Sequence, residues 1–579
     1  MKRMYQTIFA ALMVIFFILP AKVNAADSDT LTIFASDAKS LDEIINTDTT
    51  AAGVRAHAAY KLVSTDTTYL WYGAVTASSD FTVIGVPGSD GRLPCLQPGI
   101  LSDGSMPAFL FTLTGNGATA TFKNFYIYGM TVNADWNWGK AFLLNGDNMR
   151  LYMDNIIIDE NRGEVVAYTG TNCSFYITNC KFRNGVYPTN YFSSIGFVSD
   201  WPSSNAVDTL VMKYNTFFCI AGQAAAPGVN SPANYVDFSN NNVIFNFVGV
   251  LRILNAGEVH VNNNMFYGVY SGAIPYGHWP AWYDPEQTGS VIAIDTMSAS
   301  DDSVWNPGDY GKDNYSWLTE AKRIAEVKNN CFFIPKAITD FWDTWNTTHT
   351  GDDSLVTPLW MNDRTAGMFA DKEHWPGFVA ENNILGVDPG YGADFAKVID
   401  STDVTNYDAG IIKYTSVLWG GTITNEFYGY KLEFPSNEYW VPTWPLPESQ
   451  DMKYTNASVL TGSTTGGPIG DPGWFNGGYT GVSENNNLQA PAKFTLSEAY
   501  PNPFNPSTNV KFSIAKAGNI SLKVYNITGE LVKVVADNVY REAGEYQYTL
   551  NMSNFSSGVY FYTLTQGAQQ ITKKLVLMK

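Results

Sequence analysis

Two short stretches decide the fold: Asn-Asn-Asn-Val-Ile-Phe at residues 240–245 and Asn-Asn-Asn-Met-Phe-Tyr at residues 262–267. In each stretch a run of asparagines leads directly into three apolar residues. The last asparagines of the two runs, Asn242 and Asn264, are 22 residues apart. This spacing is typical of one turn of a wide solenoid made of short strands.

The same pattern, an Asn followed by three mostly apolar residues, occurs eight times. The copies begin at Asn124, Asn155, Asn179, Asn215, Asn242, Asn264, Asn330 and Asn383. Runs of β-branched and aromatic residues favour strands, and Asn tolerates the left-handed backbone of a sharp corner. We therefore expect coils about 4.8 Å apart whose Asn amides hydrogen-bond from coil to coil. No sustained 3.6-residue apolar period supports a helical solenoid.

Residues from about 30 to 400 resemble the right-handed parallel β-helix of the pectate-lyase-like superfamily. Ser40–Ile45 reads as the amphipathic helix that caps such solenoids, and Tyr60–Leu62, Tyr69–Trp71 and Phe81–Gly85 read as the first coils. The expected fold class is all-β, a right-handed parallel β-helix followed by a small C-terminal β-sandwich. The resemblance rests on periodicity and not on a catalytic motif, so it implies a fold more than an activity.

The C-terminal tail differs in composition from the rest of the chain. Residues 491–579 carry nine Lys and Arg against five Asp and Glu, whereas residues 26–490 carry 23 against 49. The tail resembles the C-terminal sorting domain of the type IX secretion system of Bacteroidota. Four segments carry the resemblance in order: Tyr500–Pro506, Leu522–Leu531, Ser557–Tyr562 and Lys573–Lys579. Such domains are recognised by an outer-membrane translocon, and alternating strands predict a sandwich of six or seven strands. A fibronectin-like spacer or a glycan-binding sandwich is the alternative.

The N-terminus is typical of an export signal. Lys2 and Arg3 precede the apolar run Ile8–Leu19, and Val23–Ala25 supplies small residues for cleavage. A run of twelve residues is too short to span a membrane. These features together predict the following domains: a signal peptide at 1–25, a β-helix at 26–400 with aromatic insertions at about 268–325 and 335–378, a cap or closing region at 401–483, a linker at 484–490 and the sorting domain at 491–579.

Charge and cysteine content limit the partners. The net charge of −19 disfavours nucleic acid and anionic membranes, because both require a basic surface. We predict secretion or attachment to the outer cell surface, with the translocon and extracellular polysaccharide as partners and no transmembrane segment in the mature chain. The five cysteines imply no disulfide framework. Cys173 could pair with Cys180, but Cys180 and Cys331 hold the same place in the repeat, which favours a role as small core residues.

Aromatic residues concentrate in the two insertions. Twelve of the 16 Trp lie between Trp279 and Trp474. Because aromatic rings stack on the apolar faces of sugars, we predict a carbohydrate-binding cleft. Its candidate residues are Trp279, Trp282, Tyr283, Trp342 and Trp345. Packing of the insertions onto the rod is the competing interpretation for each of them.

One coil carries a basic pair. The residues two positions after each repeat Asn are apolar except Lys181, and Arg183 follows on the same strand face. A polysaccharide lyase requires such a pair to neutralise a uronate carboxylate and remove its C5 proton. Asp154, Asp159 and Glu160 on the neighbouring coil are candidate calcium ligands, although no cofactor is required. The pair could instead form ion pairs with Asp159 or Glu160.

The predicted function is a β-helix protein that binds extracellular polysaccharide or acts as a surface scaffold. A polysaccharide lyase or glycoside hydrolase acting in a groove of the β-helix is the alternative. An adhesive or assembly protein is a third possibility, which an exposed apolar ladder at Tyr126, Phe217, Phe266 and Phe332 would favour.

Overall fold

The computed structural model describes residues 29–131, 140–161, 163–185, 198–199, 205–227, 232–275, 278, 290–295, 320–400, 410–421, 452–475 and, apart from short gaps, 494–578. The predicted signal peptide at 1–25 lies outside these residues. The chain divides into two compact units, one ending at Gly481 and one beginning at Val482. Each unit has its own hydrophobic core.

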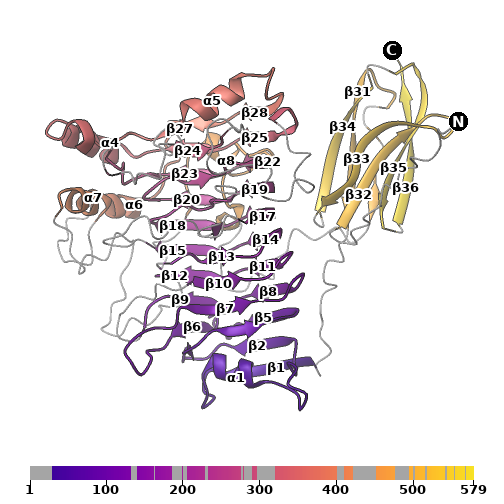
Figure 1. Cartoon of the computed structure of the whole chain (residues 1–579). Coiled ribbons are helices and arrows are strands. Elements are labelled where there is room, and N and C mark those ends of the chain that lie inside the picture. The colour runs from indigo at the N-terminus through magenta and orange to yellow at the C-terminus, as the bar shows by residue number, and fades with distance from the viewer. Residues whose placement is uncertain are drawn as a thin grey trace, which may run out of the picture. The chain divides into compact units, whose positions relative to one another are not determined.

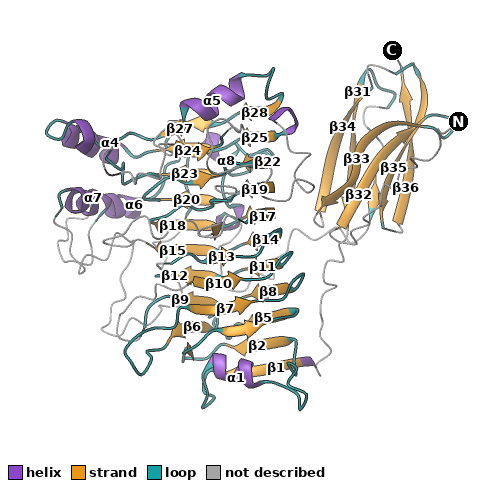
Figure 2. Cartoon of the chain, in the orientation of Figure 1, coloured by secondary structure: helices purple, strands orange, loops and turns teal. Residues whose placement is uncertain are grey.

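The first unit is a parallel β-helix, as predicted (Figures 1 and 2). Its coils run through three sides, and within each sheet the strands pair in parallel from one coil to the next. The first side is an eleven-stranded sheet, here sheet A. Its strands are β1 (Thr30–Phe34), β2 (Ala59–Val63), β5 (Phe81–Val86), β8 (Thr119–Lys123), β11 (Arg150–Asp154), β14 (Cys173–Thr178), β17 (Val207–Lys213), β19 (Ala233–Ser239), β22 (Ala256–Asn262), β25 (Ile324–Lys328) and β28 (Gly377–Glu381).

The second side is a ten-stranded sheet, here sheet C. Its strands are β3 (Tyr69–Trp71), β6 (Cys95–Pro98), β9 (Tyr126–Tyr128), β12 (Ile157–Asp159), β15 (Lys181–Gly185), β18 (Thr216–Ile220), β20 (Asn242–Ile244), β23 (Met265–Tyr267), β26 (Cys331–Phe333) and β29 (Ile384–Leu385). The third side consists of a five-stranded and a three-stranded sheet. Their strands are β4 (Val75–Ala77), β7 (Phe109–Leu113), β10 (Lys140–Leu144), β13 (Val166–Tyr168) and β16 (Val198–Ser199), then β21 (Leu251–Arg252), β24 (Ser290–Ala293) and β27 (Leu359–Met361).

Helices lie at the start of the rod and in its C-terminal part. The predicted N-terminal cap is confirmed as α1 (Leu41–Thr47), whose first turn is capped by the Ser40 hydroxyl. The other described helices are α4 (Lys336–Asn346), α5 (Asp363–Ala370), α6 (Asp394–Ile399), α7 (Ile411–Trp419) and α8 (Ala457–Leu460), with short 3-10 turns η3 (Glu320–Lys322), η4 (Gly351–Asp353) and η6 (Pro472–Trp474).

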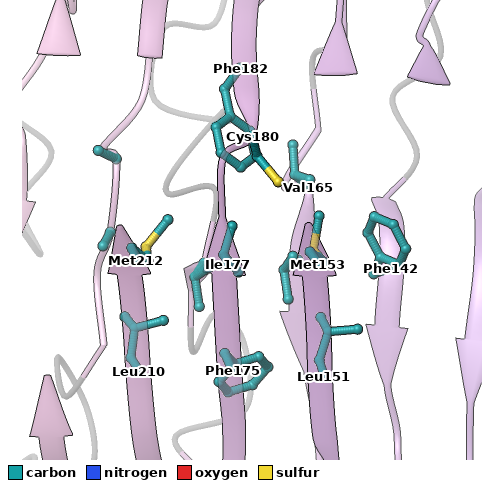
Figure 3. Close-up of a cluster of buried hydrophobic side chains, with 14 of the residues drawn as sticks. Phe142, Leu151, Met153, Val165, Phe175, Ile177, Cys180, Phe182, Leu210 and Met212 are labelled. Carbon is teal, nitrogen blue, oxygen red and sulfur yellow. The ribbon is translucent and has the colours of Figure 1, made fainter. Parts of the chain in front are cut away.

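The interior of the rod is a continuous stack of apolar side chains. Strand alternation points one set of residues inward, so equivalent positions of successive coils touch each other. Figure 3 shows part of this stack, with Leu151, Phe175 and Leu210 on neighbouring strands of sheet A and Phe182 on sheet C. This interior is where most of the apolar surface of the unit is buried.

The backbone conformation at the corner between sheets A and C explains why asparagine recurs in the sequence. The first corner residue has a positive φ between 51° and 60° in every described coil from β8 to β28. Seven of these eight residues are Asn, the residue type that tolerates this conformation best after Gly. They are Asn124, Asn155, Asn179, Asn240, Asn263, Asn329 and Asn382, and Tyr214 is the exception.

The second corner residue forms a buried asparagine ladder in the later coils. The backbone N–H of Asn241 donates to Asn264 Oδ1 at 2.9 Å, and that of Asn264 donates to Asn330 Oδ1 at 2.9 Å. The ladder starts at Asn215 and ends at Asn383. Each of these side-chain amides also donates to a backbone carbonyl of the sheet A strand in the preceding coil. The predicted hydrogen bonding from coil to coil is therefore confirmed.

The eight repeat asparagines do not all hold one structural position, as the single pattern implied. Asn124, Asn155 and Asn179 are first corner residues, whereas the other five are second corner residues or follow them directly. The alignment of the repeats was therefore wrong for the later coils, by two residues at Asn242 and by one residue at the other four. Cys180 consequently faces the interior, and Cys331 lies on the outward side of sheet C next to Met265. All five cysteines are free.

The two long spacings are not simple excursions from the rod. The segment at about 268–325 contains β24, which pairs with β21 and β27 and so completes its coil. The segment at about 335–378 contains α4, β27 and α5. The sequence missed these third-side strands because they carry no asparagine signature. Coil length therefore varies, while the stacking of the coils continues.

The second unit contains seven described strands in two antiparallel sheets, which confirms the predicted small β domain. The three-stranded sheet contains β30 (Thr495–Leu496), β31 (Ser507–Ile514) and β34 (Gly544–Asn551). The four-stranded sheet contains β33 (Leu531–Arg541), β32 (Gly518–Tyr525), β35 (Gly558–Gln566) and β36 (Gln569–Leu577). Residues from both sheets form one core.

Candidate functional site

Lys181 and Arg183 lie on the outward face of sheet C, in β15. Phe182 between them points into the rod, where its ring stacks on that of Phe217 at 4.7 Å. The prediction that the two basic residues share a face is therefore confirmed. Both side chains are buried, with about 8% of each residue exposed.

Lys181 does not interrupt an apolar ladder, contrary to the sequence interpretation. Its register partners are Ile157 and Thr216, which also face outward. Phe217, Phe266 and Phe332 belong to the inward row with Phe182. The error follows from the one-residue shift at the corner. Because Phe217 and Phe266 are fully buried, the exposed ladder of an adhesive protein is absent at these positions.

Arg183 is paired within a buried polar cluster. Its Nε lies 3.2 Å from Asp159 Oδ2. The Tyr126 hydroxyl donates to the same oxygen at 2.6 Å, and the Asn184 amide donates to Asp159 Oδ1 at 2.8 Å. Burial raises the pKa of Asp159, and Arg183 opposes this rise. The alternative interpretation of the sequence, that Arg183 forms an ion pair with Asp159, is therefore confirmed.

Lys181 is covered by an indole ring. Its Nζ lies 4.6 Å from the ring centroid of Trp474, a cation–π contact. Trp474 is held by its own Nε1, which donates to Thr216 Oγ1 at 2.8 Å. Burial lowers the pKa of Lys181 to about 7; the positive charge of Arg183 adds to this effect and Asp471 opposes it.

The segment that carries Trp474, residues 469–475, lies along the outward face of sheet C and is called the closing segment below. The backbone N–H of Gly470 donates to Asn263 O at 2.6 Å, and that of Asp471 donates to Asn242 Oδ1 at 3.1 Å. The sequence places this stretch in the cap or closing region at 401–483, which predicts contact with the end of the rod. It instead contacts the side of the central coils, because their outward face is apolar and Ile469 packs into that cluster.

Two of the aromatic candidates for carbohydrate binding lie within the described residues. Trp342 lies on α4 and is fully buried in the cluster outside sheet C, so it packs the insertion onto the rod. Trp345 is half-buried, stacks on His349 at 3.8 Å and donates through Nε1 to Asp353 O at 3.2 Å. Trp279, Trp282 and Tyr283 lie outside the described residues.

The structure does not bring the three candidate calcium ligands together. Asp154 ends β11 in sheet A, where its Oδ1 accepts from Thr178 Oγ1 at 2.9 Å and Asn179 Nδ2 at 2.7 Å. Asp159 and Glu160 are buried on the outward side of sheet C. Across the described part of the chain, no group of three His, Cys, Asp or Glu side chains is placed to hold a metal ion.

The outward face of sheet A carries a row of residues, all half-buried except the buried Asp237, that the sequence did not reveal. Tyr152 and Tyr176 are register partners, and their rings stack at 4.7 Å with an interplanar angle of 7°. The row continues through Val211 and Asp237 to His260. Alternation within each strand marks these residues as outward, but only the register between coils places them in one row.

His260 joins neighbouring acidic residues on this face. Its Nε2 lies 2.8 Å from Glu258 Oε1 and its Nδ1 lies 3.0 Å from Glu326 Oε2. Burial lowers the pKa of His260, but the hydrogen bond with Glu258 and the nearby carboxylates raise it overall. Lys328 Nζ contacts Glu326 Oε1 at 2.9 Å, so Glu258, His260, Glu326 and Lys328 form a connected hydrogen-bonding network at this end of the row.

The comparison with known families identifies the second unit. Residues 498–578 match the family described as the secretion system C-terminal sorting domain. This unit is a type IX secretion sorting domain. The sorting domain implies export through the type IX machinery and attachment to the cell surface, so the predicted localisation is confirmed. No curated protein matches the chain. Among the described residues, no helix has the length and apolarity needed to cross a membrane.

Proposed function

We propose that the β-helix is a non-catalytic rod at the cell surface that binds extracellular polysaccharide along the outward face of sheet A. The half-buried Tyr152, Tyr176 and His260 of this row carry the proposal. Their phenol and imidazole groups can exchange hydrogen bonds with sugar hydroxyls, while ring edges contact the apolar parts of the sugar. Rungs about 4.8 Å apart let a linear polymer contact many coils at once.

The charge of the chain favours a neutral polysaccharide. The net charge is −19, and a polyanion would be repelled over the length of the rod. On sheet A, Lys213 contacts Asp237 at 2.6 Å and Lys328 contacts Glu326 at 2.9 Å. These pairs balance charge locally and leave a surface suited to hydroxyl groups.

Binding to immobilised neutral polysaccharides tests this proposal with the mature full-length protein. We expect the double variant Tyr152→Ser/Tyr176→Ser to bind at least about ten times more weakly than the wild type, a loss of about 1.4 kcal/mol. Tyr72→Ser is the matched control, because this tyrosine is exposed and follows β3 of sheet C, away from the outward face of sheet A. Unchanged binding by the tyrosine variant would contradict the assignment of the surface.

A second candidate function is a polysaccharide lyase at Lys181 and Arg183. It is supported by the pKa of about 7 for Lys181, which would let the neutral amine act as a base near neutral pH. Lys181 Nζ would take the C5 proton of a uronate while the C4=C5 double bond forms and the bond from C4 to the leaving oxygen breaks, with water supplying a proton to that oxygen. Arg183 would neutralise the carboxylate. The cover formed by Trp474 opposes this candidate, because substrate would first have to displace the indole.

The absorbance of unsaturated products separates the two candidates. Acidic polysaccharides are incubated with the protein, with calcium or with a chelator, because calcium at Asp154, Asp159 or Glu160 would belong to the lyase candidate. Product that disappears in Lys181→Ala and Arg183→Ala would establish the lyase. Binding without product would support the rod. Absence of both would favour a surface scaffold.

A further inference from the structure

The sorting domain exposes large apolar side chains. The described exposed examples in this unit are Ile527, Leu531, Val534, Val559, Phe561 and Met578. The described rod is several times longer and exposes seven, namely Phe34, Val54, Tyr72, Val86, Ile324, Leu359 and Leu385. This concentration is unusual for a small sandwich whose core is already filled by the facing sides of its two sheets.

The register gathers four of these six residues on one face of the four-stranded sheet. Tyr525 pairs with Leu531 on one side and with Phe561 on the other. Val559, two residues from Phe561, points to the same side, whereas the neighbouring Tyr560 and Tyr562 are buried in the core. Val534 extends the strip through its pairing with Lys523. The residues Tyr525, Leu531, Val534, Val559 and Phe561 are called the outward strip.

Two described lysines add positive charge to this face. Lys574 pairs with Phe561 and is exposed, and Lys523 lies on the same side two residues before Tyr525. A complementary partner therefore presents an apolar groove with acidic residues at its rim. A membrane surface fits less well, because the strip lies on a sheet whose edge strands would also have to be desolvated.

We propose that the outward strip, with Lys574 at its rim, is the surface through which the type IX secretion machinery contacts this sorting domain. The family match implies that the type IX secretion machinery recognises this unit. The strip combines large apolar side chains with positive charge, the combination that anchors a protein interface at its centre and orients it at its rim.

The secreted fraction measured in the native host tests the proposal. We expect Leu531→Ser/Phe561→Ser to lower secretion of the full chain at least about tenfold, with the protein retained inside the cell envelope. The matched control is Phe34→Ser/Leu385→Ser on the rod. Its residues are 45% and 46% exposed, against 49% and 37% for the tested pair, so the loss of exposed apolar area is similar. The control should be secreted normally.

Folding and an alternative occupant require separate measurements. Lys574→Glu changes only an exposed charge, so it should leave the unfolding midpoint unchanged yet lower secretion by reversing the complementarity. The proposal would be overturned if Lys574→Glu and a correctly folded Leu531→Ser/Phe561→Ser variant were both secreted normally. Dimerisation of the wild-type chain that the serine pair abolishes without lowering secretion would also overturn it, because the strip would then bind a second copy.

Discussion

Asn264 shows how one buried polar side chain can satisfy the hydrogen-bonding groups at a corner of the solenoid. Its Oδ1 accepts from the backbone N–H of Asn241, and its Nδ2 donates to Phe238 O and to Asn330 Oδ1. The amide therefore supplies both donor and acceptor at a corner where turning the chain leaves strand groups without sheet partners. A buried polar group with all its bonds made costs little, whereas one left without them costs free energy.

Asn264→Ala is expected to destabilise the rod by about 2 to 4 kcal/mol, because it leaves at least two buried backbone groups without partners. The measurement is urea unfolding followed by Trp fluorescence, which reports only on the rod since the last Trp is Trp474. Thr121→Ala on the outward face of sheet A is the control and should change the midpoint little. A small effect for Asn264→Ala would mean that water replaces the amide.

Lys181 predicts a pH dependence with a defined sign. Its pKa is about 7 in the folded chain and near its ordinary value of 10.5 when unfolded. The unfolded state therefore binds more protons between these values, so this residue makes the folded state more stable as pH rises above about 7. Lys181→Met removes the titration but keeps the contact with Trp474.

The stability difference between wild type and Lys181→Met should increase in favour of the wild type by about 2 to 3 kcal/mol between about pH 7 and pH 9. Comparison with the variant cancels the titration of other groups. Equal slopes for the two proteins would show that Lys181 is solvated and that the closing segment does not bury it.

At the scale of elements, the position of the closing segment depends on the close approach of the Gly470 backbone to the side chain of Asn242. Gly470 has φ near 92°, and a Cβ there would lie 2.0 Å from Asn242 Oδ1 and 3.1 Å from Met265 Cβ. Asn242 cannot retreat freely, because it sits in a strand of sheet C between Thr216 and Met265. Glycine is therefore required for contact as well as for conformation.

Gly470→Ala should detach the closing segment, and Gly466→Ala should not. Gly466 has a similar φ of 78°, but a Cβ added there would meet no other atom within 4 Å, so it controls for backbone strain alone. Amide hydrogen exchange of residues 469–475 is the measurement, and we expect at least about tenfold faster exchange only in Gly470→Ala. Equal exchange in both variants would mean that the segment is held by other contacts.

At the scale of the whole molecule, the rod and the sorting domain have separate cores. Separate cores predict that each unit folds without the other. The delivery signal can then be changed without altering the surface that the rod presents, and the two units can be tested separately.

Ending the chain at Gly481 should abolish export but leave the rod folded. The expected results are loss of the cell-surface fraction and an unchanged urea midpoint by Trp fluorescence. A chain with residues 484–490 replaced by a Gly/Ser linker of equal length is the control, and it should be exported. A lower midpoint for the truncated rod would show that the sorting domain stabilises it.

The sequence by itself determined the fold class and the presence of a C-terminal sorting domain for export. Asn followed by short β-branched and aromatic runs predicts tight corners between short strands, and alternation correctly placed Lys181 and Arg183 on one face. The sorting domain was identifiable because its recognition segments are contiguous in the chain. Such properties depend on neighbours a few residues apart, which is the range over which a sequence can be interpreted directly.

Only the tertiary structure decided which residues are neighbours across coils. The lengths of the loops set the register, and a shift of one residue exchanges inward and outward positions. Phe217 therefore lies inside the rod while Thr216 is the partner of Lys181. Trp474 reaches Lys181 from a distant part of the chain, and Tyr152 meets Tyr176 on an open face. These contacts arise from the stacking of complete coils, because side chains that distant in sequence are brought together by packing and not by local backbone preference.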